Sequence, residues 1–172
     1  MRIVALLRGV NVGGVRFAMA DLRAALQEAG FADVRTVLAS GNVLVTTDDD
    51  PRTTADRVHD VILQRFGFDL AAIAVDLDAV RTAVATYPFP RTSDRHAYVV
   101  FASDPAAVRA LIVGDALDDD EQVAAGEGVL HWTVPKGRTI DSVFGRRLAH
   151  RVREGTVTTR NLNTLEKILA VG

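Results

Sequence analysis

The first 75 residues alternate between short apolar runs and longer segments in which apolar residues recur every three to four positions. Apolar runs of this length predict strands, and the three-to-four spacing predicts helices. The order is β-α-β-β-α-β, which is typical of a ferredoxin-like antiparallel sheet with helices on one face. The predicted strands are residues 3–7, 34–38, 43–45 and 70–75, and the predicted helices are residues 19–29 and 51–66.

The remaining residues repeat this pattern imperfectly. The predicted helices are 78–86, 105–112, 141–152 and 164–170, and the predicted strands are 96–102, 122–125 and 129–134. Gly126-Glu127-Gly128 is a hairpin signal between the last two strands. We therefore predict an α+β fold of two ferredoxin-like halves packed together, with antiparallel or mixed sheets and helices on one face. The N-terminal half is 1–75, and the C-terminal α/β half with its basic helical tail is 76–172.

Composition favours an ordinary globular protein. The chain has 172 residues, of which 48% are hydrophobic and 24% charged, and it has no cysteine. This excludes disulfide scaffolds and zinc sites built on cysteine. No apolar run approaches the roughly 18 residues of a membrane span, and the run 3–7 is too short for a signal peptide. We therefore expect a cytoplasmic protein with no membrane partner.

Charge is unevenly distributed along the chain. Residues 46–132 carry seven Arg against sixteen acidic residues, whereas residues 133–172 carry eight Lys or Arg against three. A basic segment on an acidic body indicates either a site for phosphate or nucleic acid or the solvated face of a helix. The net charge of −2 and the low aromatic content of 6% argue against an aromatic platform for nucleic-acid bases.

Three polar segments interrupt the apolar elements, and the first is Arg8-Gly9-Val10-Asn11-Val12-Gly13-Gly14. A glycine-rich loop between a strand and a helix can turn the backbone N–H groups of Gly13 and Gly14 toward an anion. Arg8 can add a guanidinium and Asn11 an amide. The loop matches neither the dinucleotide-binding nor the P-loop motif. The alternative is that its glycines only supply positive φ.

The second segment is the turn Ser40-Gly41-Asn42, between two predicted strands. A hairpin turn alone explains it. The functional interpretation is that Ser40 and Asn42 point into the same cleft as Arg8, because they occupy adjacent positions of one sheet.

The third segment precedes the last predicted helix and contains Arg160, Asn161, Asn163 and Thr164. Asn163 and Glu166 have the spacing of a capping box, so part of the segment is helix punctuation. Arg160 and Asn161 are not needed for a cap, and polar side chains before a helix N-terminus suit an oxyanion or phosphate.

Other candidate sites are weaker. The four histidines show no metal-ligand spacing, so each is expected on the surface or in the core. The acidic run 118–121 is expected to be a solvated loop, and Trp132 a core residue. No sequence motif identifies a nucleophile or a general base. We expect no metal and no cofactor.

The three polar segments and two further strings together resemble the bacterial domain of unknown function family 1697. The strings are Leu6-Leu7-Arg8-Gly9-Val10-Asn11-Val12-Gly13-Gly14, Met19-Ala20-Asp21-Leu22-Arg23, Gly30-Phe31-Ala32-Asp33-Val34-Arg35-Thr36, Ser40-Gly41-Asn42-Val43 and Thr159-Arg160-Asn161-Leu162-Asn163-Thr164. The resemblance implies an α+β fold with ferredoxin-like halves and carries no catalytic residue. The family usually has a Lys-containing stretch where Val15-Arg16-Phe17-Ala18 stands, and Trp where Leu162 stands. Both differences weaken a nucleic-acid interpretation.

The leading hypothesis is binding of a small anionic or phosphorylated ligand. The predicted cleft combines Arg8, Asn11, Gly13, Gly14, Ser40, Asn42, Arg160, Asn161, Asn163 and Thr164. One alternative is nucleic-acid binding through the basic C-terminal segment, and the other is a structural or interaction module without a ligand. Whether the protein is an enzyme and which oligomer it forms stay open at this point.

Overall fold

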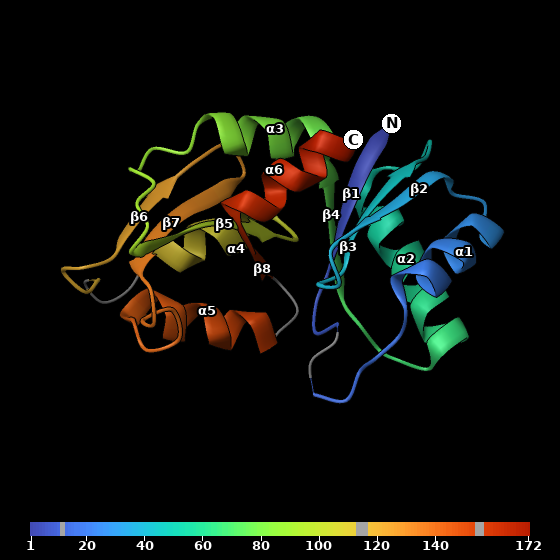
Figure 1. Ribbon diagram of the computed structural model, residues 1–172, viewed down its shortest axis with the longest axis horizontal. Helices are drawn as coiled ribbons and strands as arrows, with labels where there is room; N and C mark the ends of the chain where they lie inside the picture. Colours follow the sequence, from blue (N-terminus) through green and yellow to red (C-terminus); the bar gives the residue numbers. More distant parts are fainter. Residues whose placement is uncertain (11–12, 113–116, 154–156) are drawn as a thin grey trace. The chain divides into compact units, whose positions relative to one another are not determined.

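Two four-stranded antiparallel sheets carry the fold (Figure 1). This computed structural model describes residues 1–10, 13–112, 117–153 and 157–172. Contacts divide the chain into one unit of Met1–Val80 with Glu166–Gly172 and a second unit of Arg81–Leu165. The division differs from the expected boundary near residue 75 in that Glu166–Gly172 group with the N-terminal unit. No helix among the described residues is long and apolar enough to cross a bilayer.

The first unit has the predicted β-α-β-β-α-β order. Its elements are β1 (Arg2–Leu7), α1 (Met19–Glu28), β2 (Ala32–Val37), β3 (Asn42–Thr46), α2 (Pro51–Phe66) and β4 (Ala72–Asp76), followed by α3 (Leu77–Ala85), of which Arg81–Ala85 group with the second unit. The strand order is β2-β3-β1-β4, and every pairing is antiparallel. The local signals explain α2: Asp50 Oδ1 accepts from Thr53 N at 3.0 Å, and Gly67 ends the helix with a φ of 72°.

The central strand β1 is buried on both faces. Ile3, Ala5 and Leu7 belong to the core cluster that also contains residues of α1 and α2. Val4 and Leu6, which point to the other face, have no exposed surface. A strand covered on both faces needs apolar residues at every position, which explains the unbroken run 3–7.

The second unit repeats the same topology. Its elements are β5 (Arg95–Ala102), α4 (Pro105–Ile112), β6 (Gln122–Ala125), β7 (Val129–Pro135), α5 (Val143–Arg153), β8 (Val157–Asn161) and α6 (Leu162–Val171), of which Glu166–Val171 group with the first unit. The strand order β6-β7-β5-β8 is that of the first sheet, with each strand replaced by its counterpart. The prediction of two ferredoxin-like halves is confirmed.

The strand β8 was not predicted. Residues 158–161 show no apolar alternation, so they were interpreted as part of a polar segment before a helix. The strand forms through antiparallel pairing with β5, which joins Ala102 to Val157 and Tyr98 to Asn161. Pairing partners distant in sequence therefore determine this strand, and β8 completes the pattern that the sequence repeated imperfectly.

The acidic run 118–121 is not the solvated loop that we expected. Glu121 is buried: its Oε1 accepts from the backbone N of Phe144 at 3.0 Å and its Oε2 from Nε1 of Trp132 at 3.1 Å. Asp118 Oδ2 accepts from Val143 N at 3.1 Å. Both carboxylates thus satisfy free N–H groups at the N-terminus of α5, where negative charge is favourable. Trp132 is fully buried in the core, as expected.

A single glycine lets the segment before α5 pack against that helix. A Cβ on Gly145 would lie 1.8 Å from the carbonyl oxygen of Thr139. Gly145→Ala is therefore expected to lower the free energy of unfolding by about 1–3 kcal/mol. In an unobstructed helix interior the same change raises the free energy of unfolding by about 1 kcal/mol. A decrease would therefore indicate the steric contact with Thr139. Urea unfolding measures it, and a variant as stable as the wild type would contradict this contact.

Candidate functional site

Two of the predicted polar segments lie at the same end of neighbouring strands in the first unit. The register pairs Leu6 of β1 with Asn42 of β3, and Leu7 N donates to Gly41 O at 2.8 Å. This pairing brings the end of β1 next to the turn Ser40-Gly41-Asn42, and a common cleft of Arg8, Ser40 and Asn42 stays a prediction. Asn11 lies outside the described residues.

The turn Ser40-Gly41-Asn42 is held by its own contacts. Asn42 is fully buried, and its Nδ2 donates to Val37 O at 2.8 Å and to Ser40 Oγ at 3.1 Å. Gly41 has a φ of 77°, and a Cβ there would lie 2.8 Å from Leu7 Cβ. The fold therefore accounts for Gly41 and for the amide of Asn42 without a ligand.

Arg8 remains a candidate in this unit. Its side chain is half-buried, and that burial lowers the pKa of the guanidinium from its ordinary value. No side chain or carbonyl among the described residues hydrogen-bonds to the guanidinium, and the backbone N of Arg8 donates to Ala71 O at 3.1 Å. Gly13 and Gly14 adopt positive φ with open space around them. Positive φ is the role that the alternative interpretation, without an anion, gives to these glycines.

The third polar segment, in the second unit, forms the end of β8 and the beginning of α6. Arg160 Nη1 donates to Thr158 Oγ1 at 2.8 Å and to Thr159 O at 3.0 Å. Asn161 Oδ1 accepts from Asn163 N at 2.9 Å and so caps α6. The predicted capping box of Asn163 and Glu166 is wrong, since the helix begins two residues earlier than a cap at Asn163 requires. The cleft that was to join this segment to Arg8 and Ser40 stays a prediction.

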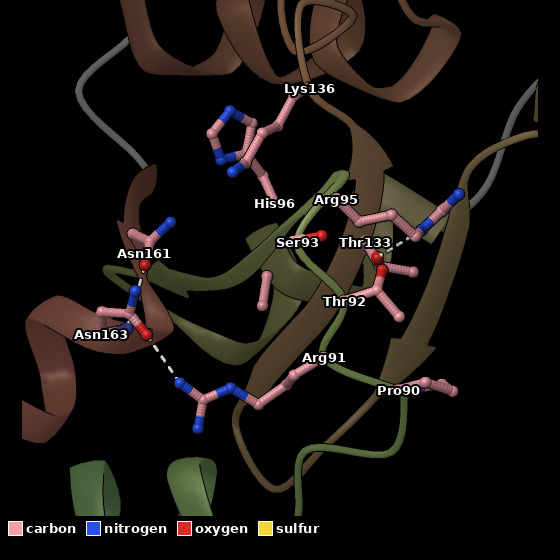
Figure 2. Close-up of a pocket in the computed structure, with 11 residues that line it drawn as sticks. Pro90, Arg91, Thr92, Ser93, Arg95, His96, Thr133, Lys136, Asn161 and Asn163 are labelled. Carbon is pink, nitrogen blue, oxygen red and sulfur yellow. Dashed lines mark hydrogen bonds between the residues drawn. The ribbon is translucent and has the colours of Figure 1, made fainter.

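A pocket opens at one end of the second sheet (Figure 2), with a volume of about 420 Å³. Antiparallel pairing explains its position, because the start of β5 lies beside the ends of β7 and β8. The segment before β5 completes the lining. The residues that line it are Pro90, Arg91, Thr92, Ser93, Arg95, His96, Ala97, Thr133, Lys136, Asn161 and Asn163.

Several hydrogen-bond donors in this pocket are free of partners. Among the residues that the structure describes, Lys136 Nζ, the imidazole of His96, Asn161 Nδ2 and the Ser93 hydroxyl make no hydrogen bond, and a neutral imidazole offers one N–H donor. His96 and Asn161 also share a face of the sheet: Tyr98 is opposite Asn161 in the register, and side chains two apart on a strand point the same way. Figure 2 shows these groups around the pocket.

Two arginines of the lining are held by the protein itself. Arg91 Nη2 donates to Asn163 Oδ1 at 2.6 Å. Arg95 donates through Nε to Thr133 Oγ1 at 3.0 Å and through Nη2 to Asp120 O at 2.7 Å. Their hydrogen bonds fix the two guanidinium groups, and their charge adds to the positive potential of the pocket.

No carboxylate lines the pocket. Asp94 is adjacent in sequence to two lining residues, Ser93 and Arg95. The hydrogen bond from the Thr92 side chain holds the pKa of Asp94 below its usual value, and the charges of Arg95 and Lys136 contribute further. Asp94 is exposed and stays ionised at neutral pH. It offsets part of the positive charge without contributing to the lining.

Sequence reasoning found Asn161 and Asn163 but missed the other polar residues of the pocket. The segment 89–94 lies between a predicted helix and a predicted strand, and His96 was expected on the surface or in the core. Arg91 and His96 are far from Lys136 and from β8 in sequence. Only the strand pairing brings them together, and one of the paired strands was not predicted.

The described residues contain no group of three His, Asp or Glu side chains placed to hold a metal ion. His131 is instead a core residue: it is buried, and its Nε2 lies 2.9 Å from Ala83 O. Burial lowers the pKa of His131, and the hydrogen bond to Ala83 partly opposes that shift.

The model of a family described as a protein of unknown function (DUF1697) matches residues 1–131. The chain belongs to this family. A similar solved structure is that of the conserved bacterial protein SP0830 from Streptococcus pneumoniae, with a TM-score of 0.77 and 21% identity over 99% of this chain and 97% of that one. This similarity supports a shared fold. No curated protein matches the chain. The family match includes Arg91, Arg95 and His96 but ends before Lys136 and Asn161.

The lowered pKa of His131 makes stability depend on pH. The unfolded chain takes up a proton near the ordinary histidine pKa of about 6.5, whereas the folded protein does so only at lower pH. The free energy of unfolding therefore falls as pH decreases through this window. His131→Gln, which does not titrate, is expected to make the fall between about pH 7 and pH 5 shallower than in the wild type. His150→Gln, at an exposed histidine, serves as the control, and an unchanged slope in His131→Gln would refute the assignment.

Proposed function

We propose that the protein binds a small anionic ligand in the pocket of the second unit. The observation that supports this proposal is the set of unpaired donors, Lys136 Nζ, the His96 ring and Asn161 Nδ2, around a lining without a carboxylate. Donors left without partners by the fold can bind a ligand at no cost to internal hydrogen bonds. Arg91 and Arg95 make the same pocket attractive to negative charge.

The first turn of α6 supports the same function. Asn161 caps the helix and Asn163 is in its first turn, and both line the pocket. The N-terminus of a helix has free N–H groups and a partial positive charge, which favour an anion. A pocket of about 420 Å³ has the size of a small-molecule site rather than of an extended groove.

Nucleic-acid binding is less well supported. Part of the basic C-terminal segment holds the fold: Arg147 Nη1, on α5, donates to Leu111 O at 2.8 Å. Leu162, where the family usually has Trp, is buried, so this position packs in the core and presents no stacking face. A ligand-free interaction module would leave the unpaired donors of the pocket without a role. A bacterial origin and a cytoplasmic location stay predictions.

The two lysines of the chain, Lys136 and Lys167, provide a matched pair of variants. A thermal-shift screen would test inorganic phosphate, phosphorylated metabolites, nucleotides and simple carboxylates. A ligand at about 100 times its dissociation constant adds roughly 2.7 kcal/mol, which raises the midpoint of wild type by about 5 °C or more. Lys136→Ala is expected to lose most of that shift, and Lys167→Ala, on exposed surface, to keep it.

No shift in the wild type with any compound of the panel would overturn the proposal. Arg8→Ala in the same screen tests the wider cleft predicted from the sequence. If this variant also loses the shift while it keeps the wild-type melting temperature, the site extends to Arg8.

Asn161 separates binding from folding, because its two side-chain atoms have different roles. Asn161→Asp keeps an oxygen that caps α6, since Asp and Asn are equally good caps. It replaces the amide donor with a negative charge inside the pocket. We expect the melting temperature to stay close to that of the wild type and the anion-induced shift to disappear. Asn161→Ala, in contrast, should lower stability by about 1 kcal/mol through loss of the cap. An Asn161→Asp variant that binds anions normally would place the ligand elsewhere.

A further inference from the structure

We propose that the ligand of this pocket is a phosphate monoester, bound through its phosphoryl group. The inference rests on the proposed function and narrows it to one class of anion. It follows from which donors are free, how many elements supply them and how much charge surrounds them.

The free donors are single groups that come from different elements. Lys136 follows β7, His96 is on β5, Asn161 ends β8, and Ser93 precedes β5. Each offers one donor group from its own direction. A phosphoryl group has three terminal oxygens in a pyramidal arrangement, so it can accept hydrogen bonds from several sides at once. Lysine binds phosphate as a point charge and needs no fixed plane.

A carboxylate fits these donors less well. Its two oxygens lie in one plane, and the matching donor is the fork of an arginine. Arg95 uses both Nε and Nη2 on Thr133 and Asp120. Arg91 uses Nη2 on Asn163. The fork that Nε and Nη2 of Arg95 would offer a carboxylate is therefore occupied by the protein's own contacts, and Arg91 already uses one nitrogen in this way.

Charge favours a dianion. Arg91, Arg95 and Lys136 line the pocket, and Asp94 next to it offsets about one of these charges. A phosphate monoester carries −1.5 to −2 at about pH 7. A phosphodiester group in a nucleic acid carries only one negative charge, and the nucleic-acid backbone continues on both sides of it.

Chemical labelling of the wild-type protein tests this inference without any variant. An amine-reactive acylating reagent at about pH 8, where phosphate is dianionic, would modify both Lys136 and Lys167, and peptide mass spectrometry would give the two rates. The probes are inorganic phosphate, glycerol 3-phosphate, acetate, succinate and a single-stranded oligonucleotide. With a probe at about ten times its dissociation constant, the rate at Lys136 should fall about tenfold while the rate at Lys167 stays constant.

We expect glycerol 3-phosphate and inorganic phosphate to protect Lys136 at concentrations at which the carboxylates do not. If acetate or succinate protects equally well, the phosphate assignment is wrong and anion binding stands. If no probe protects Lys136, both proposals fall. If the oligonucleotide protects at lower concentration than the monoester, with protection that decreases steeply with salt, the site binds a nucleic-acid backbone instead.

Discussion

The pairing of β5 with both β7 and β8 is the constraint on which the second unit depends. β5 is a central strand, and its antiparallel register aligns Arg95 with Pro135 and Tyr98 with Asn161. These two pairings provide hydrogen-bond partners on both sides of β5 and determine which residues of the three strands lie side by side. Tyr98 stacks on Trp132 at a centroid distance of 5.1 Å within the sheet's inner face. Beyond this pair His96 lies opposite Val134, which is still in the core, and Pro135 and Lys136 follow, so the pocket lies where the strands reach the limit of the core.

The first unit shows how much of such a fold the sequence determines locally. The run 3–7 is apolar throughout because β1 is covered on both faces, and Asp50 and Gly67 delimit α2 by capping chemistry that acts within a few residues. These elements could be predicted. The edge strand β8 could not, because Thr158, Thr159 and Arg160 form a strand only when β5 supplies their hydrogen-bond partners. β-propensity depends strongly on such context.

The acidic run 118–121 shows the same limit for polar residues. A cluster of carboxylates next to a short strand usually faces water, and nothing nearby in sequence indicates otherwise. In the fold, Glu121 meets the N–H groups of Trp132 and Phe144, and Asp118 meets that of Val143. A buried carboxylate is tolerated because hydrogen bonds satisfy both of its oxygens. The partners come from α5 and β7, so only the tertiary structure reveals whether these carboxylates are solvated or structural.

The candidate site illustrates why polar residues at element ends are a poor guide by themselves. Asn42 and Asn161 both end or begin strands and both looked suitable for a ligand. Asn42 donates its amide to Val37 and Ser40 and is fully buried, so the turn uses it. Asn161 caps α6 with its oxygen and leaves its nitrogen free in the pocket. The useful criterion is therefore the donor or acceptor that remains after the fold has satisfied its own groups. By that criterion Asn161, His96 and Lys136 form one candidate site, and their common sheet end is a consequence of the pairing that the sequence could not show.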